Sequence, residues 1–261
     1  MTLRTIRGPE DFAAAFGVSR DTIGRLLTFE SLLRRWQKAV NLVAPGTLEA
    51  VWHRHFADSA QLASLAPPGA RSFIDLGSGA GFPGLVVAIM LADSPPPLRP
   101  RGEGRGRDQA QPASGAPSPL HAPGGPPARL EEAAVRFVLI ESDTRKAAFL
   151  REVVRGVGAL PAIAVDILSA RAESARTRVN LALPPRVICA RALAPLDRLL
   201  ALASPLSPPG TTGLFCKGKE VAKELQAAAK NWKFDVALLP SVTDRNGRIA
   251  VITNLECKAK D

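Results

Sequence analysis

The stretch that decides the fold is Phe73-Ile-Asp-Leu-Gly-Ser-Gly-Ala-Gly-Phe-Pro-Gly84. It begins with a short, mostly apolar run, which is typical of a buried strand in a parallel sheet. Gly77, Gly79 and Gly81 then alternate through a turn, where glycine permits positive φ angles and lets a ligand approach closely. Pro83 suits the first turn of the apolar helix that follows. Strand, glycine turn and helix together predict half of a nucleotide-binding βαβ unit.

The glycine turn fits two classes of ligand. Residues Gly79 to Gly84 match the dinucleotide fingerprint G-x-G-x-x-G, whereas the residues from Asp75 match the acidic-x-G-x-G-x-G pattern of S-adenosylmethionine-dependent methyltransferases. A dinucleotide fingerprint begins where its strand ends, and here that position belongs to Gly77. A carboxylate at Asp75 also suits a ligand with an ammonium and a sulfonium, and would repel a pyrophosphate. We therefore favour the methyl donor, and a nicotinamide-dependent oxidoreductase is the alternative.

The composition and charge of the chain indicate which binding partners and which cellular compartment to expect. The formal net charge is +10 over 261 residues, and +8 of it lies in residues 133–261. Such a charge favours a polyanionic partner, most simply nucleic acid. The three cysteines lack metal-ligand spacing, so we expect no metal; their odd number, without a secretory signal, favours the cytoplasm. No run of 18 apolar residues occurs, so we expect no contact with a membrane.

The sequence divides into a helical region and an α/β domain. Residues 1–67 carry apolar side chains at helical spacing, which predicts a helical N-terminal region. Residues 68–261 are predicted to form the second domain. Within it, residues 93–132 contain ten prolines and six glycines. This composition cannot offset the entropy cost of ordering, so we predict a disordered insertion there.

Beyond the insertion, apolar runs alternate with helical stretches. They predict strands at 135–140, 163–165, 187–190 and 214–216, and a closing pair at 234–239 and 249–252. The alternation is typical of the α/β class, with a Rossmann-like, mostly parallel sheet and helices on both faces. Ligands bind at the carboxyl ends of such strands. Glu141, Arg191 and Lys217 fall at these ends.

Glu141 is a candidate to bind a ribose. Without the insertion it follows Gly81 by about 20 residues, the spacing at which an acidic side chain meets a ribose hydroxyl pair. A glutamate that is merely exposed at the end of a strand is the alternative.

Two further sets of polar residues are candidates for other roles. His55 and Asp58 are three residues apart and so share a helix face. We expect a hydrogen bond to a neighbouring helix there, rather than acid–base or metal chemistry, because no third ligand is in view. Lys217, Lys219 and Lys223 follow the fifth predicted strand and are candidates to contact RNA phosphates, with a solvated helix face as the alternative.

Several separated motifs resemble those of the bacterial ribosomal RNA small subunit methyltransferase G family, also called glucose-inhibited division protein B. They are Asn41-Leu42, Arg54-His-Phe-Ala-Asp-Ser59, the stretch from Asp75 to Gly84, Glu141-Ser with Lys146 and Phe149-Leu150, Arg191-Ala-Leu-Ala-Pro-Leu196, and Phe215-Cys-Lys-Gly218. The resemblance covers nearly the whole chain, and the insertion departs from the compact family pattern.

The resemblance implies a class I methyltransferase with a helical N-terminal region. It implies methyl transfer from S-adenosyl-L-methionine to N7 of guanine 527 in 16S rRNA of the small ribosomal subunit. By motif position, the cofactor-binding residues are Gly77 with Gly79 of the same turn, Phe82, Ala172 and Glu173 at the adenine side, and Arg191. We favour a monomer.

Methylation of guanine N7 requires no general base. It presents a free lone pair on the major-groove edge and has no proton to remove. We therefore name no catalytic residue, and expect Arg191 to act by positioning. The sequence also lacks tyrosine and the Asn/Asp-Pro-Pro-aromatic motif used on exocyclic amines. An RNA-binding module that kept the fold without activity is the other alternative.

Overall fold

The computed structural model describes residues 5–93, 135–179 and 184–258. The insertion predicted at 93–132 therefore lies outside the described residues, apart from Asp93. The Asp93 carboxylate forms an ion pair with Arg25 at 2.8 Å and accepts hydrogen bonds from the hydroxyls of Ser19 and Thr22. The chain is thus fixed to the N-terminal region at the point where the insertion begins.

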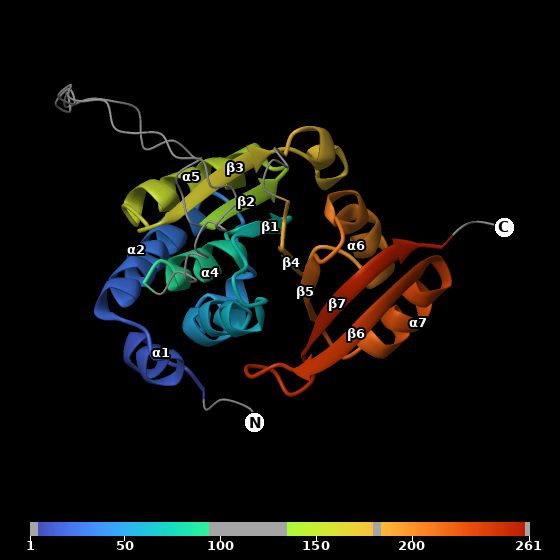
Figure 1. Ribbon diagram of the computed structural model, residues 1–261. Coiled ribbons are helices and arrows are strands. Elements are labelled where there is room, and N and C mark those ends of the chain that lie inside the picture. Colours follow the sequence, from blue (N-terminus) through green and yellow to red (C-terminus); the bar gives the residue numbers. More distant parts are fainter. Residues whose placement is uncertain (1–4, 94–134, 180–183, 259–261) are drawn as a thin grey trace, which may run out of the picture.

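A seven-stranded sheet forms the centre of the molecule, in the order β3-β2-β1-β4-β5-β7-β6 (Figure 1). The parallel strands are β1 (Ser72–Leu76), β2 (Val135–Glu141), β3 (Ile163–Ser169), β4 (Val187–Arg191) and β5 (Thr212–Lys217). The closing strands are β6 (Trp232–Pro240) and β7 (Arg248–Cys257), and β7 runs antiparallel to both of its neighbours. The predicted α/β class and mostly parallel sheet are confirmed.

The strand order switches direction at β1. The chain leaves β1 toward β2 and β3 on one side and returns to β4 and β5 on the other. The connections that follow β1 and β4 therefore run to opposite sides of the sheet. Such a switch point leaves a crevice for ligands at the carboxyl ends of these two strands.

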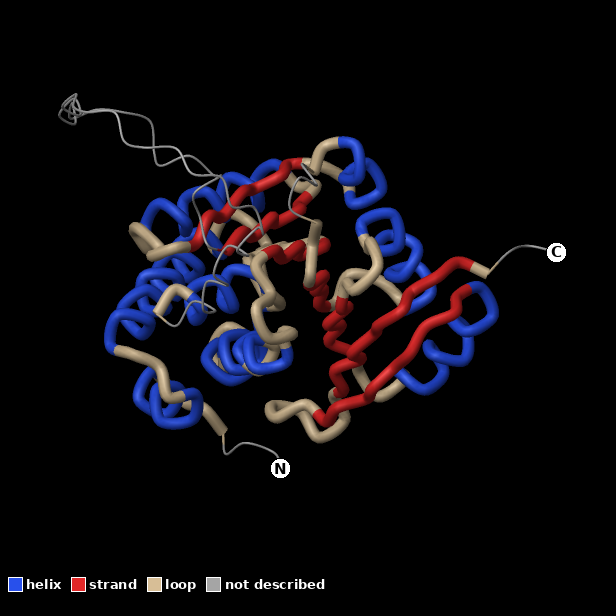
Figure 2. The backbone as a smooth tube through the Cα atoms, viewed as in Figure 1, coloured by secondary structure: helices blue, strands red, loops and turns tan. Residues whose placement is uncertain are grey.

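Helices cover both faces of the sheet (Figure 2). One face carries α4 (Gly84–Leu91) and α5 (Thr144–Gly156), together with the N-terminal elements α1 (Pro9–Phe16), α2 (Arg20–Gln37), η1 (Pro45–Thr47), the π-helix η2 (Trp52–Ala57), α3 (Asp58–Ala60) and η3 (Ala63–Leu65). The other face carries η4 (Ala172–Thr177), α6 (Leu196–Ala203), η5 (Ser204–Leu206) and α7 (Val221–Asn231).

The N-terminal helices share a hydrophobic core with the sheet domain. Phe29 of α2 stacks on Phe82 of the glycine turn, with ring centroids 5.2 Å apart, and approaches Phe149 of α5. Phe29 and Phe149 are fully buried. The predicted helical N-terminal region is confirmed, but this core crosses the boundary placed after residue 67, which stays a prediction.

The buried carboxylate of Asp75 binds the backbone at the end of the glycine turn. Its Oδ2 accepts a hydrogen bond from the Gly84 backbone N–H at 3.0 Å, at the start of α4. The residue is only 1% exposed, because its side chain packs closely against Gly84 at the start of α4. The interpretation that Asp75 faces the charged end of a ligand is therefore wrong. Its carboxylate binds the positive end of the helix instead.

Candidate active site

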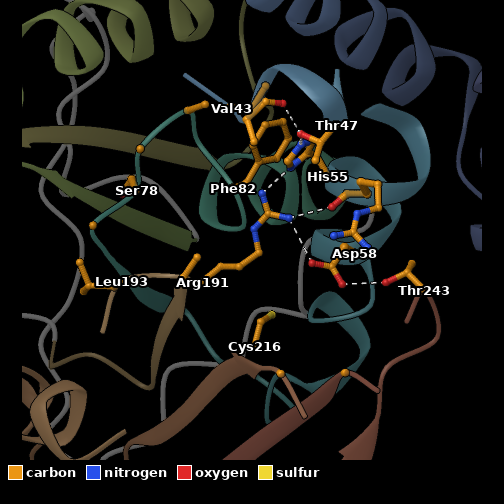
Figure 3. A pocket seen from close by; sticks show the side chains of 18 of the residues that line it. Val43, Thr47, His55, Asp58, Ser78, Phe82, Arg191, Leu193, Cys216 and Thr243 are labelled. Atoms are coloured by element: carbon orange, nitrogen blue, oxygen red, sulfur yellow. Dashed lines mark hydrogen bonds and ion pairs between the residues drawn. The ribbon is translucent and has the colours of Figure 1, made fainter. Parts of the chain in front are cut away.

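A cavity of about 680 Å³ opens at the carboxyl ends of the central strands (Figure 3). The glycine turn, the N-terminal region and the loop between β6 and β7 form its walls. A smaller hollow of about 250 Å³ lies toward η4 and α6. Gly77, Ser142 and Leu193 line both hollows. The two hollows therefore adjoin one another, and together they are called the groove.

The fold brings all the cofactor-binding candidates to this groove. Gly79, Phe82, Glu141 and Arg191 line the larger hollow, Ala172 and Glu173 line the smaller one, and Gly77 lines both. These residues come from four separate segments, and the strand ends unite them. Their contacts with a cofactor stay predictions.

Glu141 holds the glycine turn to the start of α5. Its Oε2 accepts from the Gly79 N–H at 2.8 Å, and its Oε1 accepts from the Asp143 N–H at 2.7 Å. A carboxylate has about four acceptor positions, so two remain for a ligand. The structure thus adds a structural role to the one predicted for Glu141, which is 7% exposed, and the ribose contact stays a prediction.

Arg191 is held by three acceptors from the N-terminal region (Figure 3). Nη1 donates to the Arg54 carbonyl oxygen at 2.9 Å and to Asp58 Oδ2 at 3.1 Å, and Nη2 donates to His55 Nδ1 at 2.6 Å. The guanidinium carbon also lies 5.2 Å from the centre of the Phe82 ring. Arg191 is thus oriented by residues distant in sequence, as a positioning residue requires.

His55 and Asp58 share Arg191 of β4 as their common partner, and His55 also forms the expected bond to a neighbouring helix, with Thr47 of η1 at 2.7 Å. His55 is buried and stacks on the Phe82 ring at 5.0 Å. Burial, and then the charges of Arg191 and Arg54, lower the pKa of His55 to about 3. The imidazole is therefore neutral at physiological pH and is a poor general base.

Asp58 also connects Arg191 to the loop between β6 and β7. Its Oδ1 accepts from the Thr243 hydroxyl at 2.7 Å and from Gln61 Nε2 at 3.0 Å. Gln61 in turn accepts from the backbone N–H of Val242. One carboxylate thus fixes a wall of the cavity and the guanidinium inside it.

The three lysine candidates do not form one surface. Lys217 is buried, with 7% of its side chain exposed, and its Nζ lies 2.6 Å from Glu224 and 2.8 Å from the Ala194 carbonyl oxygen. Because its charge is already neutralised, we withdraw it as a phosphate contact. Lys219 and Lys223 are exposed, and Lys223 pairs with Glu220. Their contact with RNA stays a prediction.

Cys216 lines the cavity, but its chemistry does not suit a nucleophile. Burial, and then the Asp58 charge, raise the pKa of its thiol far above the ordinary value. It therefore remains protonated at neutral pH. Within the described ranges, no group of three or more His, Cys, Asp and Glu side chains could hold a metal ion.

Sequence reasoning missed several residues of the cavity wall. Thr47 lies in η1 and Thr243 in the loop between β6 and β7, and both reach the cavity only through the tertiary fold. Neither stands at the end of a parallel strand, which was the signal used for Glu141 and Arg191. Lys146, in the first turn of α5, also lines the cavity; it belongs to the motifs of the resemblance, but no role was predicted for it.

The fold and the groove together define a class I methyltransferase: an antiparallel β7 is inserted between β5 and β6, and a glycine turn follows β1. The family model for rRNA small subunit methyltransferase G, called GidB, matches residues 22–95 and 123–249. The chain belongs to this family. The alternative of a nicotinamide-dependent oxidoreductase is thereby excluded.

Curated relatives match over almost their whole length. A ribosomal RNA small subunit methyltransferase G of Rhodospirillum centenum is 44% identical over 245 residues, which cover 94% of this chain and 90% of the relative. A protein of the same name from Parvibaculum lavamentivorans is 40% identical over 246 residues, covering 94% and 89%.

Solved structures match more distantly. An O-methyltransferase from Bacillus cereus in complex with SAH has a TM-score of 0.48 and 14% identity, over 87% of this chain and 90% of that one. Across the described part of the chain, no helix is long and apolar enough to cross a membrane.

Proposed function

We propose that the chain transfers a methyl group from S-adenosyl-L-methionine to N7 of guanine 527 in the 16S rRNA of the small ribosomal subunit. One observation carries the proposal: the chain belongs to the rRNA small subunit methyltransferase G family, and its groove at the β1–β4 crevice contains every residue that the family motifs imply. A ribosomal substrate also favours action in the cytoplasm.

Two features of the groove support the methyl donor as its ligand. Its two hollows follow one another along the strand ends, as an elongated molecule with an amino acid at one end and adenine at the other requires. Glu141 offers acceptors for the ribose hydroxyls, and Arg191 offers donors for the amino-acid carboxylate. Ala172 and Glu173 line the smaller hollow, to which we assign the adenine.

S-adenosylmethionine supplies an electrophilic methyl group on a sulfonium ion. The chain's own residues bind and orient the two reactants. Because guanine N7 has a free lone pair, no side chain has to remove a proton, which agrees with a neutral His55 and a protonated Cys216. Correct alignment of two reactants can lower a barrier by about 7–11 kcal/mol, so positioning by Arg191 and the glycine turn suffices.

An RNA substrate agrees with the positive net charge of the protein. The chain carries a formal net charge of +10, and Lys219 lies exposed directly after β5, close to Gly218 in the cavity wall. A base in structured rRNA must also be turned out of its stack to enter a cavity. We propose that the protein does this as a monomer.

Two measurements test the proposal in sequence. Calorimetry should detect binding of S-adenosylmethionine and of its product S-adenosylhomocysteine, and no binding of NAD. Incubation with small subunits that lack the modification should then transfer a labelled methyl group to 16S rRNA. Cofactor binding without transfer to any RNA substrate would identify a non-catalytic module, and failure to bind the methyl donor would refute the proposal outright.

A further inference from the structure

The hydrogen bonds of Arg191 leave part of its guanidinium unused. The group has five N–H donors, and three of them are directed at Arg54, Asp58 and His55. The side chain keeps 17% of its surface exposed, and Arg191 lines the larger hollow. Two donors therefore remain for a ligand there, and the direction in which they point depends on the three acceptors.

The hydrogen bonds around His55 fix its tautomer. Arginine can only donate, so His55 Nδ1, 2.6 Å from Arg191 Nη2, must be unprotonated. The Thr47 hydroxyl donates to the Ala44 carbonyl oxygen at 2.7 Å, and it must therefore accept from His55 Nε2, also at 2.7 Å. His55 is thus a neutral imidazole with its proton on Nε2.

We propose that His55 is a positioning residue, whose Nδ1 acts as a neutral acceptor that turns the free donors of Arg191 toward the carboxylate of the methyl donor. This assignment rests on the proposed function, because that function identifies the ligand as the methyl donor. Nothing in the hydrogen-bond pattern requires His55 to touch the ligand or to exchange a proton during the reaction.

A neutral side chain suits this position because of the charges around it. Arg191 faces His55 from β4, Arg54 neighbours it in η2, and Asp58 binds the other side of the same guanidinium. A second carboxylate in place of His55 would compete with the carboxylate of the ligand for Arg191. A cation there would repel the guanidinium. An uncharged acceptor holds Arg191 without altering the charge offered to the ligand.

Packing is the competing explanation, because His55 stacks on Phe82 in the core. Two substitutions separate the explanations. His55→Phe keeps an aromatic ring on Phe82 but removes both hydrogen bonds. His55→Gln loses the ring but supplies an acceptor for Arg191 and a donor for Thr47.

The dissociation constant of S-adenosylhomocysteine, measured by calorimetry on the full chain, should distinguish the two explanations. We expect His55→Gln to bind within about threefold of wild type, and His55→Phe to bind about tenfold or more weakly, since a buried donor is left without its partner. The reverse order, with His55→Phe like wild type, would overturn the proposal in favour of packing. Thermal unfolding of both variants checks that they fold.

The tautomer can be measured on the wild-type protein without any ligand. The ¹⁵N chemical shifts of the His55 ring, assigned by comparison with His55→Gln, should report a proton on Nε2 and no titration between pH 5 and pH 9. A proton on Nδ1, or a ring that titrates in this range, would overturn the proposal. If the wild type does not bind S-adenosylhomocysteine, the proposed function fails, and the ring shifts still decide the role of His55 as an acceptor.

Discussion

Leu193 lies directly over Gly77. A Cβ atom on Gly77 would stand 2.5 Å from Leu193 Cδ1, a distance that non-bonded carbon atoms do not reach. Gly77 has φ +67°, and Ala192, which precedes Leu193, has φ +53°. Leu193 is 37% exposed and lines both hollows of the groove. A ligand that occupies both hollows would therefore contact this side chain.

Gly77→Val should abolish binding of S-adenosylhomocysteine while the protein still folds. A branched side chain is strained at this φ angle and would occupy the space between Leu193 and the ligand. Calorimetry measures binding, and thermal unfolding measures integrity. Gly218→Val is the matched control, because Gly218 also lines the cavity but has nothing within 4 Å of an added Cβ. A folded Gly77→Val protein that binds with wild-type affinity would contradict this account of the turn.

The contact between Gly77 and Leu193 should appear as energetic coupling. We expect Gly77→Ala to lower the free energy of unfolding, and to lower it less when Leu193→Ala is also present. The remaining cost is that of a left-handed alanine, about 1–2 kcal/mol. Urea unfolding of the wild type, both single variants and the double variant completes the cycle. Strictly additive effects would show that the two residues do not interact.

Asp75 should make the stability of the protein depend on pH. Burial raises the pKa of its carboxyl from 3.8 to about 6. The folded state therefore binds more protons than the unfolded state between these values, and stability falls as pH rises from about 4 to about 6. A shift of about two units corresponds to a cost on the order of 3 kcal/mol above that range.

The variant Asp75→Asn lacks this titration. The difference in unfolding free energy between wild type and Asp75→Asn should shift against the wild type as pH rises from 4 to 6, and then stay constant to pH 8. Urea unfolding at four pH values measures it. A difference that is the same at every pH would show that the carboxyl of Asp75 titrates alike in the folded and unfolded states.

RNA affinity should depend steeply on salt, and Lys219 and Lys223 should contribute to that dependence. Each phosphate contact adds about −0.7 to the slope of log K against log salt on a single strand, and about −0.9 on a B-form duplex. Lys219→Gln with Lys223→Gln should flatten the slope and weaken binding. Lys217 is left unchanged, because its replacement would leave Glu224 without its buried partner.

The control for this pair removes the same charge at the other end of α7. Lys230→Gln with Lys233→Gln changes two exposed lysines, one in the last turn of α7 and one at the start of β6. Filter binding of 16S rRNA over a salt series measures the slopes. Equal slopes for both double variants would mean that Lys219 and Lys223 belong to a solvated helix face. Binding of S-adenosylhomocysteine should be unchanged throughout.

Much of the sheet could be predicted because a buried parallel strand is apolar throughout. The limits of this signal are visible in β3, which was predicted to end at Val165 but continues to Ser169. Asp166 interrupts the apolar pattern, and the fold compensates it with an ion pair to Arg136 of β2 at 2.7 Å. A partner on another strand cannot be recognised from local sequence.

The residues of the candidate site also divide into those that local sequence reveals and those that it does not. Glu141 and Arg191 could be found because parallel strands bring their carboxyl ends together. Asp75 was misjudged because its position near the end of a strand does not reveal that its side chain turns beneath α4. Thr47 and Thr243 could not be found at all, since only the folded chain brings Thr47 of η1 to His55 and Thr243 of the β6–β7 loop to Asp58.

The most direct test of the account is to locate the methyl group that the enzyme adds. Small subunits without the modification are incubated with the protein and labelled S-adenosylmethionine, and the 16S rRNA is then cleaved chemically at N7-methylguanosine. We predict one labelled site, at guanine 527, and none with the Gly77→Val protein. Label at another atom or another nucleotide, or no label while S-adenosylmethionine is bound, would contradict the central claim.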